Sequence, residues 1–178
     1  AVHFVSDTPD PALIDHVTAR YIETEGDLMQ VYAALLEHPA AWTPEGANIK
    51  PPVEFVGSAM RALAVDPAVV TEMPEKRVRN VLLTPMAVMG QTWQKFSGPD
   101  GWPEEDDAWL TPQGLSGRVR WAMAGPEMLR PDLPDPRAFV DAALGSLAPE
   151  DVKFAAGAAE SKSEAIGLVL MSPAFQRR

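Results

Sequence analysis

The placement of proline constrains the fold of this chain more than any other sequence feature. Four prolines directly follow Asp or Thr, in the pairs Asp10-Pro11, Asp66-Pro67, Thr111-Pro112 and Asp135-Pro136. Proline is tolerated at the first helical position because the N–H that it lacks would have no partner within the helix, and Asp or Thr just before it caps the helix. Each pair therefore predicts the start of a helix.

Apolar residues at helical spacing extend this prediction along the chain. They predict helices over about 11–23, 27–38, 51–63, 72–89, 112–123, 136–144, 149–159 and 163–171. Pro85 is expected to kink or split the helix over 72–89. No segment shows sustained strand alternation with hairpin turn pairs. We therefore expect an all-α fold, an irregular bundle of about eight helices.

The apolar stripes of the first three helices are expected to face the core. They consist of Leu13, Ile14, Val17 and Tyr21 in the first helix, Leu28, Val31, Tyr32, Leu35 and Leu36 in the second, and Val53, Val56, Met60 and Leu63 in the third, with Phe55 and Ala59 beside the last set.

The segment 91–110 loses helical periodicity and is rich in Trp, Pro and Gly. Connectors of this length are uncommon in compact domains and are often functional. We expect an ordered loop across the bundle, with Trp109 inward and Trp102 at the rim. Trp93 and Trp109 are expected to fold back over the core, whereas Trp102 can instead bind a sugar face or a partner protein, since indole rings give large, rigid contact areas.

Charge and cysteine content exclude several classes of function. The net charge is −10, and the densest basic run, Lys76, Arg77 and Arg79, is too small to bind a nucleic acid. The absence of cysteine excludes disulfides, Cys-ligated zinc and a thiol nucleophile. The longest apolar run, residues 165–171, is far shorter than the roughly 20 residues that cross a bilayer. We expect a soluble acidic domain, with no nucleic-acid partner and no membrane insertion.

Motifs for catalysis, metals and cofactors are missing. The histidines at 3, 16 and 38 lack the spacing that places two ligands on one helix face, and Ser116 lies one residue short of a Gly-x-Ser-x-Gly elbow. The run Glu104–Asp107 can supply Ca²⁺ ligands or a pair of acid–base carboxylates, but adjacent acids more often form a solvated turn. We predict no catalytic residue, no metal and no cofactor.

Several sequence blocks, in a consistent order, resemble those of a known family. They are Lys50–Leu63, Met89-Gly90-Gln91, Gly101-Trp102-Pro103, Trp109-Leu110, Leu115 with Arg118, and Ser172–Arg178. These blocks resemble the bacterial family called domain of unknown function 1800. Paired prolines often precede Gly-Trp-Pro in that family, whereas Ser97-Gly98-Pro99-Asp100 stands here.

The resemblance implies no particular activity, substrate or cofactor. It covers nearly all of this chain but only the C-terminal part of a typical member, so we expect residues 1–178 to be one helical domain of a longer protein. The start at Ala1, without Met and followed by apolar Val2, Phe4 and Val5, agrees with this expectation. Members are often encoded beside a family that looks exported, which favours the cell envelope or periplasm over the cytoplasm.

Two functions are open at this point. The first is a non-catalytic helical domain that packs on a missing N-terminal region or on a partner protein. The second is a carboxylate-dependent hydrolase acting on a cell-envelope polymer, for which a cleft bringing Glu54 or Asp106 near Trp102 would be the sign. Candidate binding residues are Lys50, Glu54, Gln91, Trp102, Asp106, Trp109 and Arg118. Lys50 and Glu54 are expected to be structural, either bridging each other or anchoring the neighbouring loop.

Overall fold

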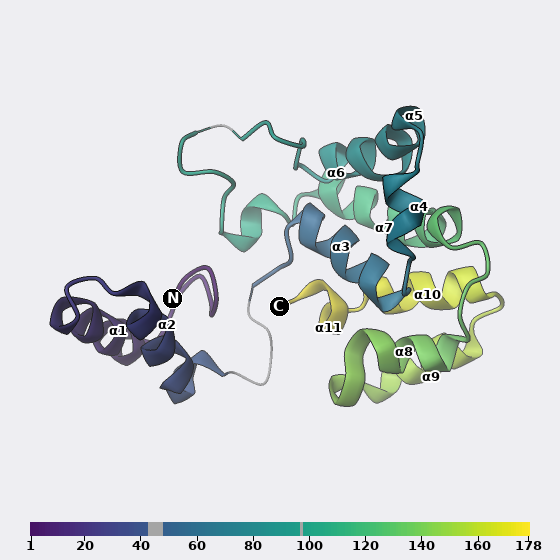
Figure 1. Ribbon diagram of the computed structural model, residues 1–178. Helices are drawn as coiled ribbons and strands as arrows, with labels where there is room; N and C mark the ends of the chain where they lie inside the picture. The colour runs from purple at the N-terminus through teal and green to yellow at the C-terminus, as the bar shows by residue number, and fades with distance from the viewer. Residues whose placement is uncertain (43–47, 97) are drawn as a thin grey trace.

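The computed structural model describes residues 1–42, 48–96 and 98–178, and within them every regular element is helical (Figure 1). The all-α prediction is therefore confirmed. The four Asp-Pro and Thr-Pro pairs begin helices α1 (Pro11–Glu23), α4 (Pro67–Thr71), α7 (Pro112–Leu129) and α8 (Pro136–Leu144). In each case the side chain before the proline accepts a hydrogen bond from a first-turn backbone N–H, as helix capping requires.

The remaining elements are α-helices that follow the apolar periodicity, with short 3-10 turns and one π-helical turn between them. They are α2 (Leu28–Glu37), η1 (Pro39–Ala41), α3 (Pro52–Ala62), α5 (Glu75–Val78), η2 (Arg79–Leu83), α6 (Thr84–Val88), η3 (Asp106–Ala108), η4 (Gly145–Leu147), α9 (Glu150–Ala158), α10 (Lys162–Met171) and α11 (Pro173–Gln176). The predicted end of α7 near Met123 is wrong, because the helix continues through Pro126.

The helix predicted over 72–89 starts later and contains an irregular turn. Pro74 precedes its first helical residue, and Pro85 has no N–H to donate to the Val81 carbonyl four residues back. That carbonyl instead accepts a hydrogen bond of 2.8 Å from the indole Nε1 of Trp121 in α7. Around this point η2 is a π-helix, so proline widens the helix here and α7 satisfies the freed carbonyl.

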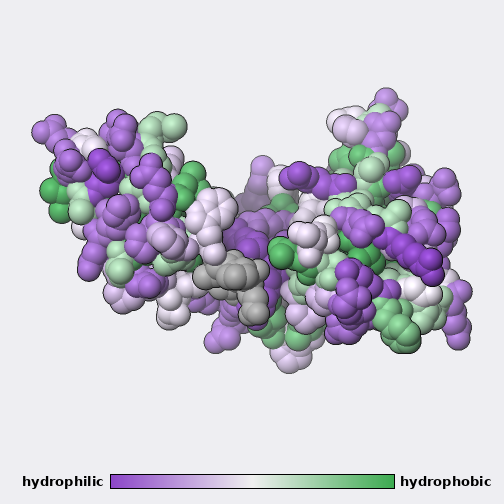
Figure 2. Space-filling view, turned by 90° about the horizontal axis from the view of Figure 1, so that it is seen from below, coloured by the Kyte–Doolittle hydropathy of each residue, from purple (hydrophilic) through white to green (hydrophobic). Residues whose placement is uncertain are grey.

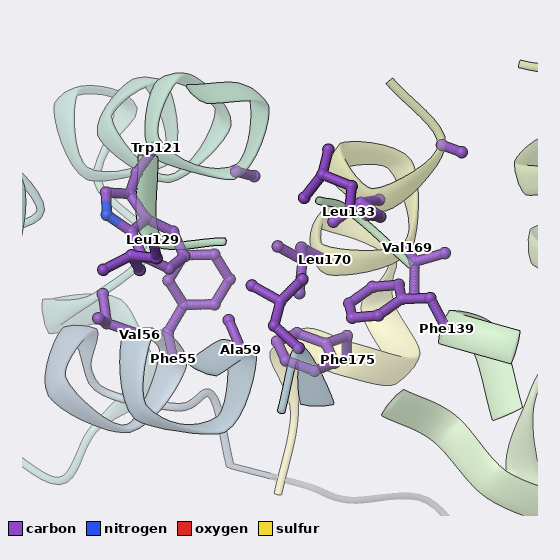
Figure 3. Packing of buried hydrophobic residues seen from close by; sticks show 14 of the residues in the cluster. Phe55, Val56, Ala59, Trp121, Leu129, Leu133, Phe139, Val169, Leu170 and Phe175 are labelled. Carbon is purple, nitrogen blue, oxygen red and sulfur yellow. The ribbon is translucent and has the colours of Figure 1, made fainter. Parts of the chain in front are cut away.

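The main core lies between α3, α7, α8 and α10 (Figure 3). The ring of Phe55 meets those of Trp121 and Phe175 edge-on, with centroids 5.5 and 6.1 Å apart. The predicted face of α3 is partly wrong: Phe55 is fully buried, whereas Val53 is exposed. Phe175 brings the C-terminal segment into this core, which positions the polar groups described below.

Residues 1–42 form a helical hairpin, α1 and α2, that lies apart from the other helices in Figure 1. We call these residues the N-terminal hairpin. Its buried cluster consists of Val5, Leu13 and Leu35, separate from the main core. The prediction that both stripes are buried is wrong, because Ile14, Tyr21, Leu28, Tyr32 and Leu36 are exposed. The single domain over residues 1–178 stays a prediction.

Candidate functional site

Two of the sequence blocks that resemble the family, Lys50–Leu63 and Ser172–Arg178, lie side by side as paired backbone segments. The Lys50 N–H donates to the Gln176 carbonyl at 2.8 Å, and the Arg178 N–H donates to the Asn48 carbonyl at 2.9 Å. An antiparallel bridge joins Ile49 to Arg177 between them. The side chains that contact these paired segments come from residues 48–54, 104–109, Arg118 and 175–178. We call these residues the junction.

Arg118 on α7 contacts both paired segments from their buried side. Its guanidinium is fully buried and donates to the Lys50 carbonyl at 2.7 Å and to Gln176 Oε1 at 2.8 Å. The Gln176 amide in turn donates to the Leu170 carbonyl at the end of α10. Burial lowers the pKa of Arg118 to about 10. Both acceptors are neutral, so within the described residues this arginine joins two chain segments by hydrogen bonds rather than by an ion pair.

Lys50 and Glu54 both contact the C-terminal segment. Lys50 Nζ donates to the Phe175 carbonyl at 2.5 Å and lies 4.1 Å from the centroid of the Phe175 ring. Glu54, in the first turn of α3, forms an ion pair with Arg178. Among the described residues Lys50 and Glu54 form no ion pair with each other, so the first of the two alternatives, a direct bridge, is not found. Their contacts support the structural role that we predicted for both.

Two residues of the acidic run, Glu104 and Asp106, contact other segments of the chain instead of lying wholly in solvent. Asp106 Oδ1 accepts a 2.6 Å hydrogen bond from the Ile49 N–H, and its other oxygen lies 3.5 Å from Arg177. Glu104 contacts Arg178 at 3.2 Å and His3 at 2.8 Å. The Asp106 N–H also donates to Asp7, so the loop ties the N-terminal hairpin to the junction. Asp107 and Glu105 remain exposed, as a solvated turn predicts.

A cavity of about 340 Å³ opens beside the loop. It is lined by Val53, Met86, Gln91, Trp93, Gln94, Phe96 and Trp102. Gln91 fixes one wall, because its Oε1 accepts a 2.7 Å hydrogen bond from the Val53 N–H at the start of α3. Trp102 stands at the rim, 6.2 Å between centroids from the buried ring of Trp109. We call this cavity the loop pocket.

The expectation for the loop is right for Trp109 and Trp102 and wrong for Trp93. Trp109 is buried and Trp102 lies at the rim, as predicted. The middle arches away from the helices instead of crossing them (Figure 1). Trp93 and Phe96 are 51% and 56% exposed, so the prediction that Trp93 folds back over the core is wrong. Ser97 lies outside the described residues.

The structure therefore sorts the seven candidate residues into two neighbouring groups. Lys50, Glu54, Asp106, Trp109 and Arg118 belong to the junction, and Gln91 and Trp102 line the loop pocket, where the Trp102 ring contacts that of Trp109. The sequence reasoning did not single out Asn48, Gln176 or Arg178. The signal for Gln176 and Arg178 was the Ser172–Arg178 block of the family resemblance, whereas Asn48 lies outside the blocks of that resemblance.

Within the described ranges no three His, Cys, Asp or Glu side chains gather in a way that would hold a metal ion. Among these residues, none of the helices combines the length and hydropathy that crossing a bilayer requires.

The burial of Lys50 leads to a testable pH dependence. Burial lowers the pKa of Lys50 from 10.5 to about 8, an effect that Glu54 partly offsets. Between these values the unfolded lysine binds a proton that the folded one has lost, so folding stability rises with pH. We expect the stability of the wild type relative to Lys50→Met to increase from about pH 7 to about pH 10.

Urea unfolding at several pH values measures this difference. Lys95→Met, which removes an exposed lysine from the loop, is the matched control and should show no such trend. If the free energy of unfolding of the wild type, relative to Lys50→Met, stays constant or falls as the pH rises over this range, the lowered pKa of Lys50 is contradicted.

The fold and junction define a class: a helical domain whose distant motif blocks are joined by buried polar contacts. The family model described as "Protein of unknown function (DUF1800)" matches residues 1–177, and the chain belongs to this family. Neither the curated proteins nor the solved structures gave a match.

Proposed function

We propose that this chain is a helical interaction domain that binds a protein segment through the N-terminal hairpin. The observation that carries the proposal is the exposure of large apolar side chains on this hairpin: Phe4, Ile14, Tyr21, Ile22, Leu28, Met29, Tyr32, Leu36 and Trp42. Figure 2 displays hydrophobic side chains at the surface of this part, among hydrophilic ones. Four of these side chains, Phe4, Tyr32, Leu36 and Trp42, line one groove. Exposed apolar surface that is contiguous in this way marks an interaction site.

The hairpin offers a defined place for such a segment. A groove of about 330 Å³ is lined by Phe4, Val5, Tyr32, Leu35, Leu36, Ala41 and Trp42. We call it the hairpin groove. Its lining is apolar, as is typical of sites that bury the side chains of a partner. The segment that binds there belongs to the N-terminal region of a longer chain or to a separate protein.

The positions of the carboxylates favour interaction over hydrolysis. A hydrolase of the kind considered above needs two carboxyl groups facing a cleft. Glu54, Glu104 and Asp106 instead contact Arg178, Arg177, His3 and the Ile49 N–H. The loop pocket next to Trp102 is lined by apolar and amide side chains. In our proposal Trp102 and Gln91 serve as a second contact for the same partner.

A photo-crosslinking amino acid at Trp42 tests this proposal. In cells of the source organism we expect one discrete crosslinked product, since Trp42 lines the hairpin groove. The same amino acid at Phe154, which is exposed on α9, is the matched control and should give none. Trp102→Ala, introduced into the Trp42-labelled chain, should lower the yield. The absence of a discrete product at Trp42 would contradict the proposal.

A further inference from the structure

We propose that the segment bound in the hairpin groove is a basic amphipathic helix. This inference rests on the proposed function and names the chemistry of the partner. It follows from three observations: the arrangement of the groove walls, the charge of the hairpin, and the hydrogen bond that orients Trp42.

The groove walls suit the apolar face of a helix. Tyr32, Leu35 and Leu36 are spaced by three and four residues, so they form a ridge along one side of α2. The other lining residues are Phe4 and Val5 from the start of the chain and Ala41 and Trp42, which follow α2. A partner helix that presents apolar residues at the same spacing can pack against such a ridge.

Trp42 is held in place before any partner binds. Its indole Nε1 donates a 2.7 Å hydrogen bond to the Leu36 carbonyl near the end of α2. The ring nevertheless remains largely exposed. A large aromatic side chain that is already ordered loses little conformational entropy on binding, which is the property of an anchor residue.

The hairpin carries most of the negative charge of the chain. Residues 1–42 contain seven acidic side chains and one basic one, a net charge of −6 out of −10 for the whole protein. The one basic residue, Arg20, pairs with Glu23 at 3.2 Å. A segment rich in Lys and Arg is attracted by this field, whereas an acidic segment is repelled.

The same charge argues against a second copy of this chain as the occupant. Two hairpins packed face to face would bring two charges of −6 together. Like charges across an interface oppose association, so a basic partner is the better fit to an apolar groove on an acidic hairpin.

Three synthetic peptides of about 18 residues, or five helical turns, test the inference with the 178-residue chain. The first is a Leu/Lys peptide with a continuous apolar helical face, the second replaces each Lys by Glu, and the third scrambles the Leu/Lys order. Binding is measured by isothermal titration calorimetry at low and high salt. We expect the first peptide to bind at least about tenfold more tightly than the other two.

Two matched variants separate groove binding from general attraction to an acidic protein. Phe4 is 65% exposed in the groove and Phe154 is 77% exposed on α9, so each can be changed to Ser with little effect on folding. Phe4→Ser should weaken binding of the ordered Leu/Lys peptide by about tenfold, and Phe154→Ser should leave it unchanged. Circular dichroism checks that both variants keep their helix content.

The possible results have distinct meanings. Equal binding of the ordered and scrambled peptides, or no effect of Phe4→Ser, overturns the basic helix as the occupant. A dimer in sedimentation velocity that Phe4→Ser dissociates overturns it in favour of a second copy. In both cases a discrete photo-crosslink at Trp42 still supports the proposed interaction, whereas its absence removes the proposed function itself.

Discussion

Trp109→Ala lowers the free energy of unfolding by about 3–5 kcal/mol, as the deletion of large aromatic side chains in cores does. The Trp109 side chain is 2% exposed and lies where the loop returns to the bundle. Its indole Nε1 makes no hydrogen bond within the described residues, so the loss comes from apolar packing rather than from a broken polar contact. Urea denaturation followed by circular dichroism measures the change.

Trp102→Ala is the matched control for this prediction. Trp102 is only partly buried and stands at the rim of the loop pocket, beside Trp109. Its removal should cost about 1 kcal/mol or less. Equal and small losses for the two variants would mean that the loop contributes nothing to the stability of the bundle.

The starts of the helices were predictable because the signals that form them are local. A capping side chain followed by proline acts within the first turn, so Asp10, Asp66, Thr111 and Asp135 needed no information from the rest of the fold. The irregular turn near Pro85 was only partly predictable. The proline predicts a disturbed helix, but the donor that satisfies Val81 is Trp121, forty residues away.

The hairpin illustrates a different limit of periodicity. The spacing of Tyr32, Leu35 and Leu36 shows which face of α2 is apolar, yet it does not show what covers that face. The structure buries Leu35 and leaves Tyr32 and Leu36 exposed. The error in the predicted core is therefore the same observation that supports an interaction surface.

The junction was not predictable from residue patterns alone because its partners are far apart in the chain. Lys50 and Phe175 are separated by 125 positions, and Arg118 reaches Gln176 across 58. An arginine paired with a carbonyl and an amide leaves no charge pattern to read, unlike an ion pair at helical spacing. The family resemblance supplied the relevant blocks, and the structure supplied the contacts between them.

Removing the guanidinium of Arg118 should give the second large loss of stability. Arg118→Met keeps an apolar stem of similar length but leaves the Lys50 carbonyl and Gln176 Oε1 without their donor. Each buried acceptor without a partner costs about 1–3 kcal/mol, so we expect a loss of about 2–5 kcal/mol in urea unfolding. Arg118→Lys should recover only part of it, because one ammonium group does not reproduce the fork of a guanidinium.

A double-mutant cycle with Gln176→Leu shows whether this loss comes from the contact itself. If Arg118 and Gln176 act through their 2.8 Å hydrogen bond, the double variant should lose less stability than the two single variants together. Arg118→Met also removes the desolvation cost of burying a charge, which partly offsets the loss of stability. Buried charged groups can often be replaced by apolar groups of similar volume for this reason. Replacing Arg118 leaves two acceptors without their donor, the Lys50 carbonyl and Gln176 Oε1. Replacing Gln176 as well removes the second of these acceptors but takes the amide donor away from the Leu170 carbonyl. A stabilised Arg118→Met, or strictly additive losses, would contradict a junction held together by this arginine.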